Sequence, residues 1–130
     1  MPEERGRRSA HPFTVRVDYE DDECRVLVAL DGNEPVGLAS GGISRDADAS
    51  TPWELYSLNV QTSAQGTGLA DDLLTAALGD RPASVWVLTA NVRARSFYRR
   101  HGFAPDGAAK PHPVSGAPEC RMVRTGVRPA

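Results

Sequence analysis

The sequence predicts an α/β (α+β) domain built on a mixed, mostly antiparallel twisted sheet with flanking helices. Two patterns lead to this prediction: hairpin-like strand sequences fill the first half of the chain, and strand–loop–helix units follow. Size and composition agree, because 130 residues with 40% hydrophobic and 25% charged side chains suit one soluble globular domain. We expect an N-terminal tail with a possible short strand over residues 1–24, disordered or loosely docked over 1–12, and the folded domain over residues 25–126.

The first half of the chain carries strand patterns separated by turns. Alternating or continuous apolar residues predict four strands, over residues 13–17, 25–30, 36–40 and 53–60. The Asp31-Gly32 pair between the second and third of them is a strong hairpin sequence. We expect Gly41-Gly42 to end the third strand and the polar segment 45–52 to form a loop.

The second half alternates helices and strands. Apolar residues at helical spacing predict a helix that buries Leu69, Leu73, Leu74, Ala77 and Leu78. An apolar run over 84–88 predicts a buried strand, and a second helix is expected between an Asn91 cap and Gly102. The proline- and glycine-rich segment that follows is expected to be irregular until a last strand over 119–124.

Composition and charge disfavour several classes of function. The net charge is −2, no apolar run approaches the length of a membrane helix, and no secretory signal is expected at the N-terminus. Cys24 and Cys120 have no Cys or His at metal-ligand spacing, which argues against a zinc finger and fits a cytoplasmic location. Residues 18–54 carry a balance of −8 and residues 81–130 of +7, without the aromatic-interleaved basic stripe typical of nucleic-acid binding. A bias to 14 arginines and 17 alanines points to a bacterial source.

One loop has the features of an anion site. The segment Gln65-Gly66-Thr67-Gly68-Leu69-Ala70 joins the strongest strand pattern to the first helix. The first amides of a helix lack intrahelical acceptors and lie at the positive end of its dipole, and glycines let a phosphate approach the backbone. No Gly-Lys-Ser/Thr follows, so this is not a Walker loop, and Asp71 stands where a dinucleotide fingerprint needs glycine. By spacing alone, a diphosphate site and a ligand-free tight turn fit equally well.

Two motifs make this loop more specific. The first is the strand 54–60 followed by Gln65-x-x-Gly68-x-Ala70. The second is the apolar strand 84–88, then Asn91, then a helix that ends in Phe-Tyr-x-x-x-Gly-Phe over 97–103. In composition, order and separation they resemble the signature segments of the GCN5-related N-acetyltransferases (GNATs), whose pyrophosphate loop is Gln/Arg-x-x-Gly-x-Gly/Ala. The resemblance covers about residues 25–124.

The resemblance implies acetyl-CoA as the cosubstrate and no metal. Family members hold acetyl-CoA where two neighbouring parallel strands splay apart, and the corresponding strands here are 53–60 and 84–88. The backbone of Leu58 and Val60 would bond the pantetheine arm, and Asn91 would bond the pantetheine or its amide. The diphosphate would be held by the backbone amides of Gln65, Gly66, Thr67, Gly68, Leu69 and Ala70.

The implied reaction is direct transfer of the acetyl group to a primary amine. Glu54 is our candidate for the base or for an acceptor-binding group, and the alternative is an edge or surface carboxylate. A backbone amide near Asn59 or Val60 would stabilise the oxyanion. Tyr98 matches the family position that protonates the departing CoA thiolate and would also contact the cofactor, and the alternative is a packing aromatic.

The N-terminal part departs from the family pattern. Family domains usually begin with a strand and two helices, whereas the 24 residues before Arg25 show no helical period, so the fold is expected to lack those helices. Because the helices form one wall of the acceptor site in the family, a homodimer that completes this wall is one expectation. The acidic segment 18–54 favours a cationic acceptor, either a small molecule or a protein amine. A non-catalytic acyl-CoA-binding or interaction module is the alternative, and a nucleotide-binding fragment that prefers ATP or NAD is a third hypothesis.

Overall fold

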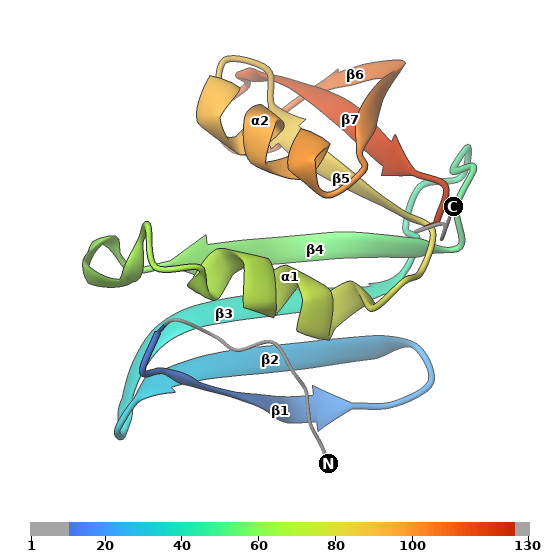
Figure 1. Cartoon of the computed structure of the whole chain (residues 1–130). Helices are drawn as coiled ribbons and strands as arrows, with labels where there is room; N and C mark the ends of the chain where they lie inside the picture. Colours follow the sequence, from blue (N-terminus) through green and yellow to red (C-terminus); the bar gives the residue numbers. More distant parts are fainter. Residues whose placement is uncertain (1–10, 127–130) are drawn as a thin grey trace. The chain divides into compact units, whose positions relative to one another are not determined.

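The computed structural model describes residues 11–126, which form seven strands and two α-helices (Figure 1). In chain order these are β1 (Thr14–Glu20), β2 (Cys24–Asp31), β3 (Glu34–Ile43), β4 (Trp53–Val60), α1 (Leu69–Leu78), β5 (Ala83–Leu88), α2 (Val92–Arg100), β6 (Ala104–Pro111) and β7 (Pro118–Arg124). A short 3-10 turn, Thr62–Ala64, precedes α1. The strands form one sheet in the order β1-β2-β3-β4-β5-β7-β6.

The sheet is mixed, as the sequence predicts. β4 pairs with β5 in parallel, whereas β1 with β2, β5 with β7 and β6 with β7 pair antiparallel. The predicted fold class, a mostly antiparallel sheet with flanking helices, is therefore confirmed. The chain divides into two compact units. The first contains the described residues up to Gly41 together with Ser57–Gly79, and the second contains Gly42–Tyr56 with the described residues from Asp80 onward.

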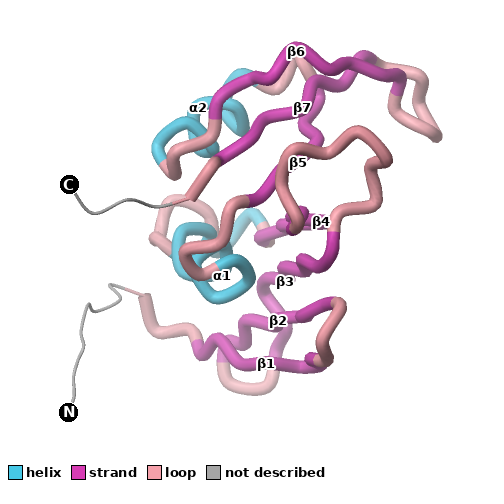
Figure 2. The backbone as a smooth tube through the Cα atoms, turned by 90° about the vertical axis from the view of Figure 1, so that its right-hand side faces the viewer, coloured by secondary structure: helices cyan, strands magenta, loops and turns pink. Residues whose placement is uncertain are grey.

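The core of the first unit forms where α1 packs against β2 and β3 (Figures 1 and 2). The predicted helical stripe is confirmed, since its five members are buried: Leu69, Leu73, Leu74, Ala77 and Leu78. Leu27 and Ala29 of β2 are buried as well. Gly37 lets β3 approach the helix closely, because a Cβ there would lie 3.0 Å from Cδ1 of Leu73. Each fully buried leucine contributes roughly 1.5–3 kcal/mol relative to an exposed one, so this stripe holds α1 in place.

In the second unit, α2 lies beside the strands β5 and β7 (Figure 1). Its buried residue is Tyr98, whose ring meets Phe103 edge-on with centroids 5.6 Å apart. Met122 of β7 and Val85 of β5 are buried and stand opposite each other across the ladder. Two aromatic rings and two aliphatic side chains therefore form the centre of this core.

A network around Arg121 fixes the loop between β3 and β4 within the second unit. The Arg121 guanidinium, 6% exposed, pairs with Asp46 at 3.3 Å, with Asp48 at 2.8 Å and with Asp106 at 2.7 Å. These hydrogen bonds raise the pKa of Arg121 and lower the pKa of Asp48. The indole Nε1 of Trp86 also donates to Asp46, at 2.8 Å. Two strands and a loop are thus tied together by groups of opposite charge.

Three predicted segments differ from the structure. The segment after α2, expected to be irregular, contains the strand β6, which pairs with β7 and lies at the edge of the sheet. An edge strand tolerates Pro105 and Pro111, because it need not donate every backbone N–H to a neighbour. Gly41 and Gly42 continue β3 to Ile43 instead of ending it, and both are buried. β1 extends to Glu20, through a register shift between Val17 and Tyr19.

Three further observations concern membrane-spanning helices, metal sites and the two cysteines. No helix of residues 11–126 is long and apolar enough to cross a membrane. Within the same residues, no group of three or more His, Cys, Asp and Glu side chains could hold a metal ion. Cys24 and Cys120 are free thiols, and burial raises the pKa of Cys24.

Candidate functional site

The loop between β4 and α1 keeps the first turn of the helix open. Gly66 and Gly68 have φ of 75° and 92°, a left-handed conformation that glycine adopts without strain. Gly68 is the N-cap of α1, and no side chain of the cap residue accepts a hydrogen bond from the helix. A Cβ placed on either glycine would meet no atom within 4 Å, so both face open space. The loop therefore leaves open space beside the first turn of α1, as an anion site requires.

Two side chains of the loop hold its shape. Gln65 Nε2 donates to the backbone oxygen of Val60 at 3.1 Å, which ties the loop to the end of β4. The hydroxyl of Thr67 donates to the oxygen of Ala64 and accepts a 3.3 Å hydrogen bond from the amide of Leu69. The predicted Gln65 and Thr67 thus support the loop through their side chains. Gly66 and Gly68 supply its open backbone, and Leu69 and Ala70 begin the helix.

The parallel pairing of β4 and β5 is short. It joins Trp53 with Ala83, Glu54 with Ser84 and Leu55 with Val85, and both strands continue beyond these pairs. In the continuing part of β4, Leu58 and Val60 are half-buried and Asn59 is exposed. Their suggested backbone contacts to pantetheine and to the oxyanion stay predictions.

An apolar groove of about 340 Å³ lies within the first unit, beside the end of β4. It is lined by Val28, Pro35, Val36, Gly37, Leu38, Asn59, Val60 and Gln61. Leu38 is 41% exposed in it, which is unusual for a large apolar side chain in the middle of a strand. The hydroxyls of Ser40 and Ser57 form a 2.7 Å hydrogen bond between β3 and β4.

Glu54 is buried within the second unit, not at the surface. Its side chain is 2% exposed, so the alternative of a surface carboxylate is wrong. Oε2 accepts from the Arg45 guanidinium at 2.8 Å, and Oε1 accepts from the Arg45 backbone amide at 3.0 Å. The side-chain hydrogen bond to Glu54 raises the pKa of Arg45, whose guanidinium also lies 4.0 Å from the ring centre of Tyr56. Both oxygens of Glu54 are thus engaged, while its partner Arg45 is 62% exposed.

Tyr98 lies on the buried face of α2. Its side chain is 8% exposed, and burial raises its pKa to about 12. The ring also meets Phe97 at 5.3 Å, so packing restricts its orientation. At pH 7 the phenol is therefore fully protonated and held rigidly, as a proton donor requires.

Asn91 has the capping role that its sequence position predicts. Its side-chain oxygen accepts the amide hydrogen of Ala94 at 3.0 Å at the start of α2. Its suggested contact with pantetheine stays a prediction.

Sequence reasoning missed two contacts near the candidate residues. The Arg45–Glu54 pair joins residues nine positions apart. In the sequence, the one feature that could have indicated this pair is a single arginine in an otherwise acidic loop. The second contact concerns His11, in the segment expected to be loosely docked. Its side chain is buried and bonds Asp72 of α1 at 2.6 Å. Nothing in the spacing of two residues 61 positions apart could indicate this bond.

Comparison with known proteins identifies the family. A family model described as "Acetyltransferase (GNAT) domain" matches residues 22–105. The chain belongs to the GNAT acetyltransferases. The predicted resemblance is confirmed, and membership implies acetyl transfer that depends on an acyl-CoA. No curated protein matches the chain significantly.

Solved GNAT structures share the fold. A histone acetyltransferase HPA2 and related acetyltransferase from Corynebacterium glutamicum is 28% identical, with a TM-score of 0.63 over 83% of this chain and 67% of that chain. Ard1 from Thermoplasma volcanium is 20% identical, with a TM-score of 0.64 over 79% and 71%. The PaiA N-acetyltransferase from Thermoplasma acidophilum, solved in complex with coenzyme A, is 17% identical, with a TM-score of 0.58 over 79% and 61%. The last two structures are less than 25% identical to this chain, so their likeness concerns the fold alone.

Proposed function

We propose that this GNAT is an N-acetyltransferase that moves the acetyl group of acetyl-CoA directly to a primary amine. The open, glycine-based N-terminus of α1 carries the proposal, because it presents backbone donors where the family motif places the CoA diphosphate. Gln65, Gly68 and Ala70 fill the defined positions of that motif. Gly66 and Gly68 leave open space on the outer side of this loop, where the diphosphate would lie.

The chain's own residues would share the work of binding the donor. The amides from Gln65 to Ala70 would bond the diphosphate, and the backbone of Leu58 and Val60 would bond the pantetheine arm as an added strand. Asn91 would bond the pantetheine through its amide nitrogen, since its oxygen already caps α2.

In the proposed reaction the acceptor amine attacks the thioester carbonyl and the C–N bond forms. The nitrogen then releases its extra proton to solvent, and the C–S bond breaks. A backbone amide at Asn59 or Val60 would stabilise the oxyanion of the tetrahedral intermediate. Tyr98 would give its phenolic proton to the departing thiolate and regain one from solvent. A thiolate held in surroundings as apolar as those of Tyr98 also has a raised pKa, so the pKa of about 12 does not prevent this transfer.

Glu54 is the proposed binding group for the acceptor ammonium, and the base that removes its proton. The exposed guanidinium of Arg45 now occupies the place that a protonated amine would take against this carboxylate. A cationic acceptor would displace Arg45 and lose a proton toward Glu54 before attack. Asp46 and Asp48, two other carboxylates of the acidic segment, already pair with Arg121. The proposed preference for a cationic acceptor therefore rests on Glu54.

Isothermal titration of the purified protein with acetyl-CoA, CoA and ATP tests the proposal, followed by a thiol-release screen across amines. We expect CoA and acetyl-CoA to bind, ATP to bind more weakly, and one class of cationic amine to release thiol. Binding without thiol release across a broad panel would favour a non-catalytic acyl-CoA-binding module. Absence of CoA binding would refute the assignment of the loop. Light scattering on the same sample tests the further proposal that a second copy completes the acceptor site.

A further inference from the structure

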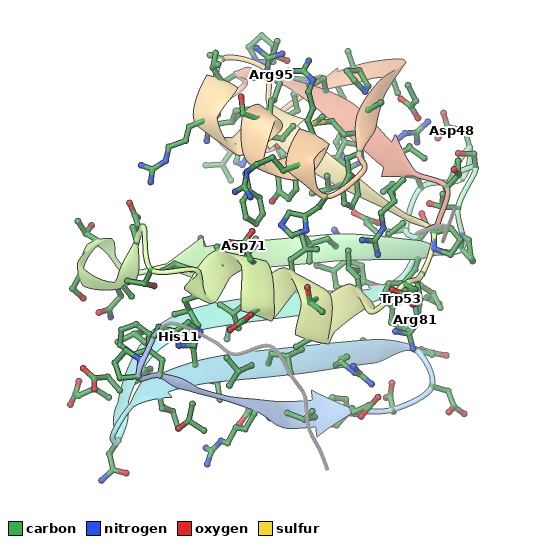
Figure 3. The ribbon with its side chains drawn as sticks, in the orientation of Figure 1. His11, Asp48, Trp53, Asp71, Arg81 and Arg95 are labelled. Atoms are coloured by element: carbon green, nitrogen blue, oxygen red, sulfur yellow. The ribbon has the colours of Figure 1, made fainter. Side chains whose placement is uncertain are left out.

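The start of the described chain is fastened to the first turn of α1. His11 Nε2 lies 2.6 Å from Asp72 Oδ2, although 61 positions separate the two residues. The His11 side chain is 2% exposed and that of Asp72 is 26% exposed. Figure 3 shows His11 at the start of β1, on the side of the N-terminus of α1. This contact is a buried bond within the first unit, not a surface encounter.

The geometry fixes which ring nitrogen of His11 carries the proton. The backbone amide of Phe13 donates to Nδ1 at 3.1 Å, so Nδ1 must present its lone pair. The Nε2–H is therefore the donor to Asp72. The imidazole also stacks on the ring of Phe13, with centroids 5.4 Å apart and planes 24° apart. The ring is held in one tautomer and one orientation.

The Asp72 carboxylate lies in the first turn of α1, at the helix end where an anion would bind. It lies with Asp71 in the first turn of α1, and its own amide donates to the oxygen of Gly68 at 3.2 Å. A carboxylate in a first turn stabilises the helix dipole, but it also repels a second anion at the same end. A hydrogen bond from His11 engages this carboxylate and ties the first turn to the N-terminal segment.

We propose that His11 is a positioning residue for CoA binding: its bond to Asp72 holds the first turn of α1 in place and occupies the Asp72 carboxylate, so that the loop amides can receive the diphosphate. This inference rests on the proposed function. His11 touches neither substrate nor reacting atoms in this scheme. It acts through Asp72 on the affinity for the donor, and the rate of the chemical step is unaffected.

Titration calorimetry with CoA on wild type, His11→Ala and His11→Gln tests the proposal. His11→Ala should weaken CoA binding about 3- to 10-fold, because the first turn of α1 loses the hydrogen bond that ties it to the N-terminal segment. His11→Gln should bind nearly as wild type, since its amide nitrogen can donate to Asp72 from a similar position. His112→Ala is the matched control. Its Nδ1 also accepts backbone amide hydrogens, from Val114 and Ser115, but it belongs to the second unit.

Thermal unfolding of each variant and steady-state kinetics separate positioning from general stability. With any amine that releases thiol, His11→Ala should raise KM for acetyl-CoA and leave kcat unchanged. Equal CoA affinity of wild type and His11→Ala would overturn the proposal, and so would a His11→Gln variant as weak as His11→Ala. A joint fall of kcat and of the folded fraction, with unchanged affinity, would also overturn it.

A second variant keeps the test decisive if His11→Ala does not fold. Asp72→Asn keeps an acceptor for His11 and removes the charge, so it should bind CoA as tightly as wild type or more tightly. Weaker binding by Asp72→Asn would overturn the proposal. A wild-type protein that binds no CoA would instead refute the proposed function, which distinguishes the two failures.

Discussion

The two helices of this protein begin in opposite ways. At the start of α2, the side chain of Asn91 accepts the amide hydrogen of Ala94 and closes the helix end. At the start of α1, the cap is Gly68 in a left-handed conformation, and the neighbouring Thr67 hydroxyl accepts only a long, 3.3 Å hydrogen bond from the amide of Leu69. A closed end stabilises its own helix, whereas an open end leaves backbone donors for a ligand. The comparison marks the start of α1 as the helix end where the proposed CoA site would lie.

The helices also differ in what they would offer to the proposed reaction. α1 would offer its N-terminal end, and α2 would offer Tyr98, a buried side chain whose ring is held by packing. Variants of the open end should therefore change the affinity for CoA. Variants of Tyr98 should change turnover.

The strongest test is to close the open end. Gly68→Asp places a carboxylate in the open space at the N-cap of α1 and closes this end to an anion, because the carboxylate would repel the diphosphate. We expect the Kd for CoA to rise about 100-fold or more. Calorimetric titration measures the change.

Gly116→Asp is the matched control for this variant. Gly116 also has a positive φ, 76°, and open space around its missing Cβ, but it belongs to the second unit. It should cost similar backbone strain and leave CoA affinity within about twofold of wild type. Equal losses in both variants would show that strain, not closure of the helix end, causes the effect.

The next largest effect concerns turnover. Tyr98→Phe keeps the buried ring and removes the proton donor, so kcat should fall about 100-fold while the Kd for acetyl-CoA changes little. Stopped-flow or steady-state thiol release measures kcat. Tyr19→Phe, which removes an exposed hydroxyl bonded to Asp21, should have wild-type turnover. A Tyr98→Phe enzyme with unchanged kcat would leave Tyr98 a packing residue only.

Burial of the same phenol predicts a dependence of stability on pH. Because the pKa of Tyr98 is raised from 10.0 to about 12, the unfolded chain loses this proton first as pH rises. The unfolded state then binds fewer protons than the folded state, so the free energy of unfolding falls between about pH 10 and pH 12. Urea unfolding across this range measures the slope. Tyr98→Phe should show a shallower fall, and identical slopes would contradict the account.

The smallest expected effect comes from opening the closed end. Asn91→Ala removes the cap of α2 and should lower the free energy of unfolding by about 1 kcal/mol. Chemical denaturation measures this change, with the exposed Ser96→Ala on the same helix as control. A loss in Asn91→Ala no larger than that of the control would mean that the cap adds little, and the contrast between the helix ends would weaken.

The sequence predicted what short-range patterns determine. The stripe from Leu69 to Leu78, the Asn91 cap and the glycine loop each depend on neighbours within a turn or two, and each has the expected local structure. The strand β6 was missed because prolines indicate irregular structure unless the edge position of the strand is known.

Long-range pairs could not be predicted from one sequence. The burial of Glu54 against Arg45 and the bond from His11 to Asp72 depend on how the chain folds back, and no local pattern encodes them. Both pairs matter for the proposed roles. The first occupies the candidate base, and the second holds the helix end that would bind the donor.

The central claim is that the open end of α1 binds the CoA diphosphate. The most direct test is the change in amide ¹H–¹⁵N resonances when CoA is added to the labelled protein. The account predicts that the amides from Gly66 to Ala70 shift strongly, and that the amides of Val114 and Ser115, already bonded to His112, shift little. Saturable CoA binding that leaves the amides from Gly66 to Ala70 unmoved would contradict it.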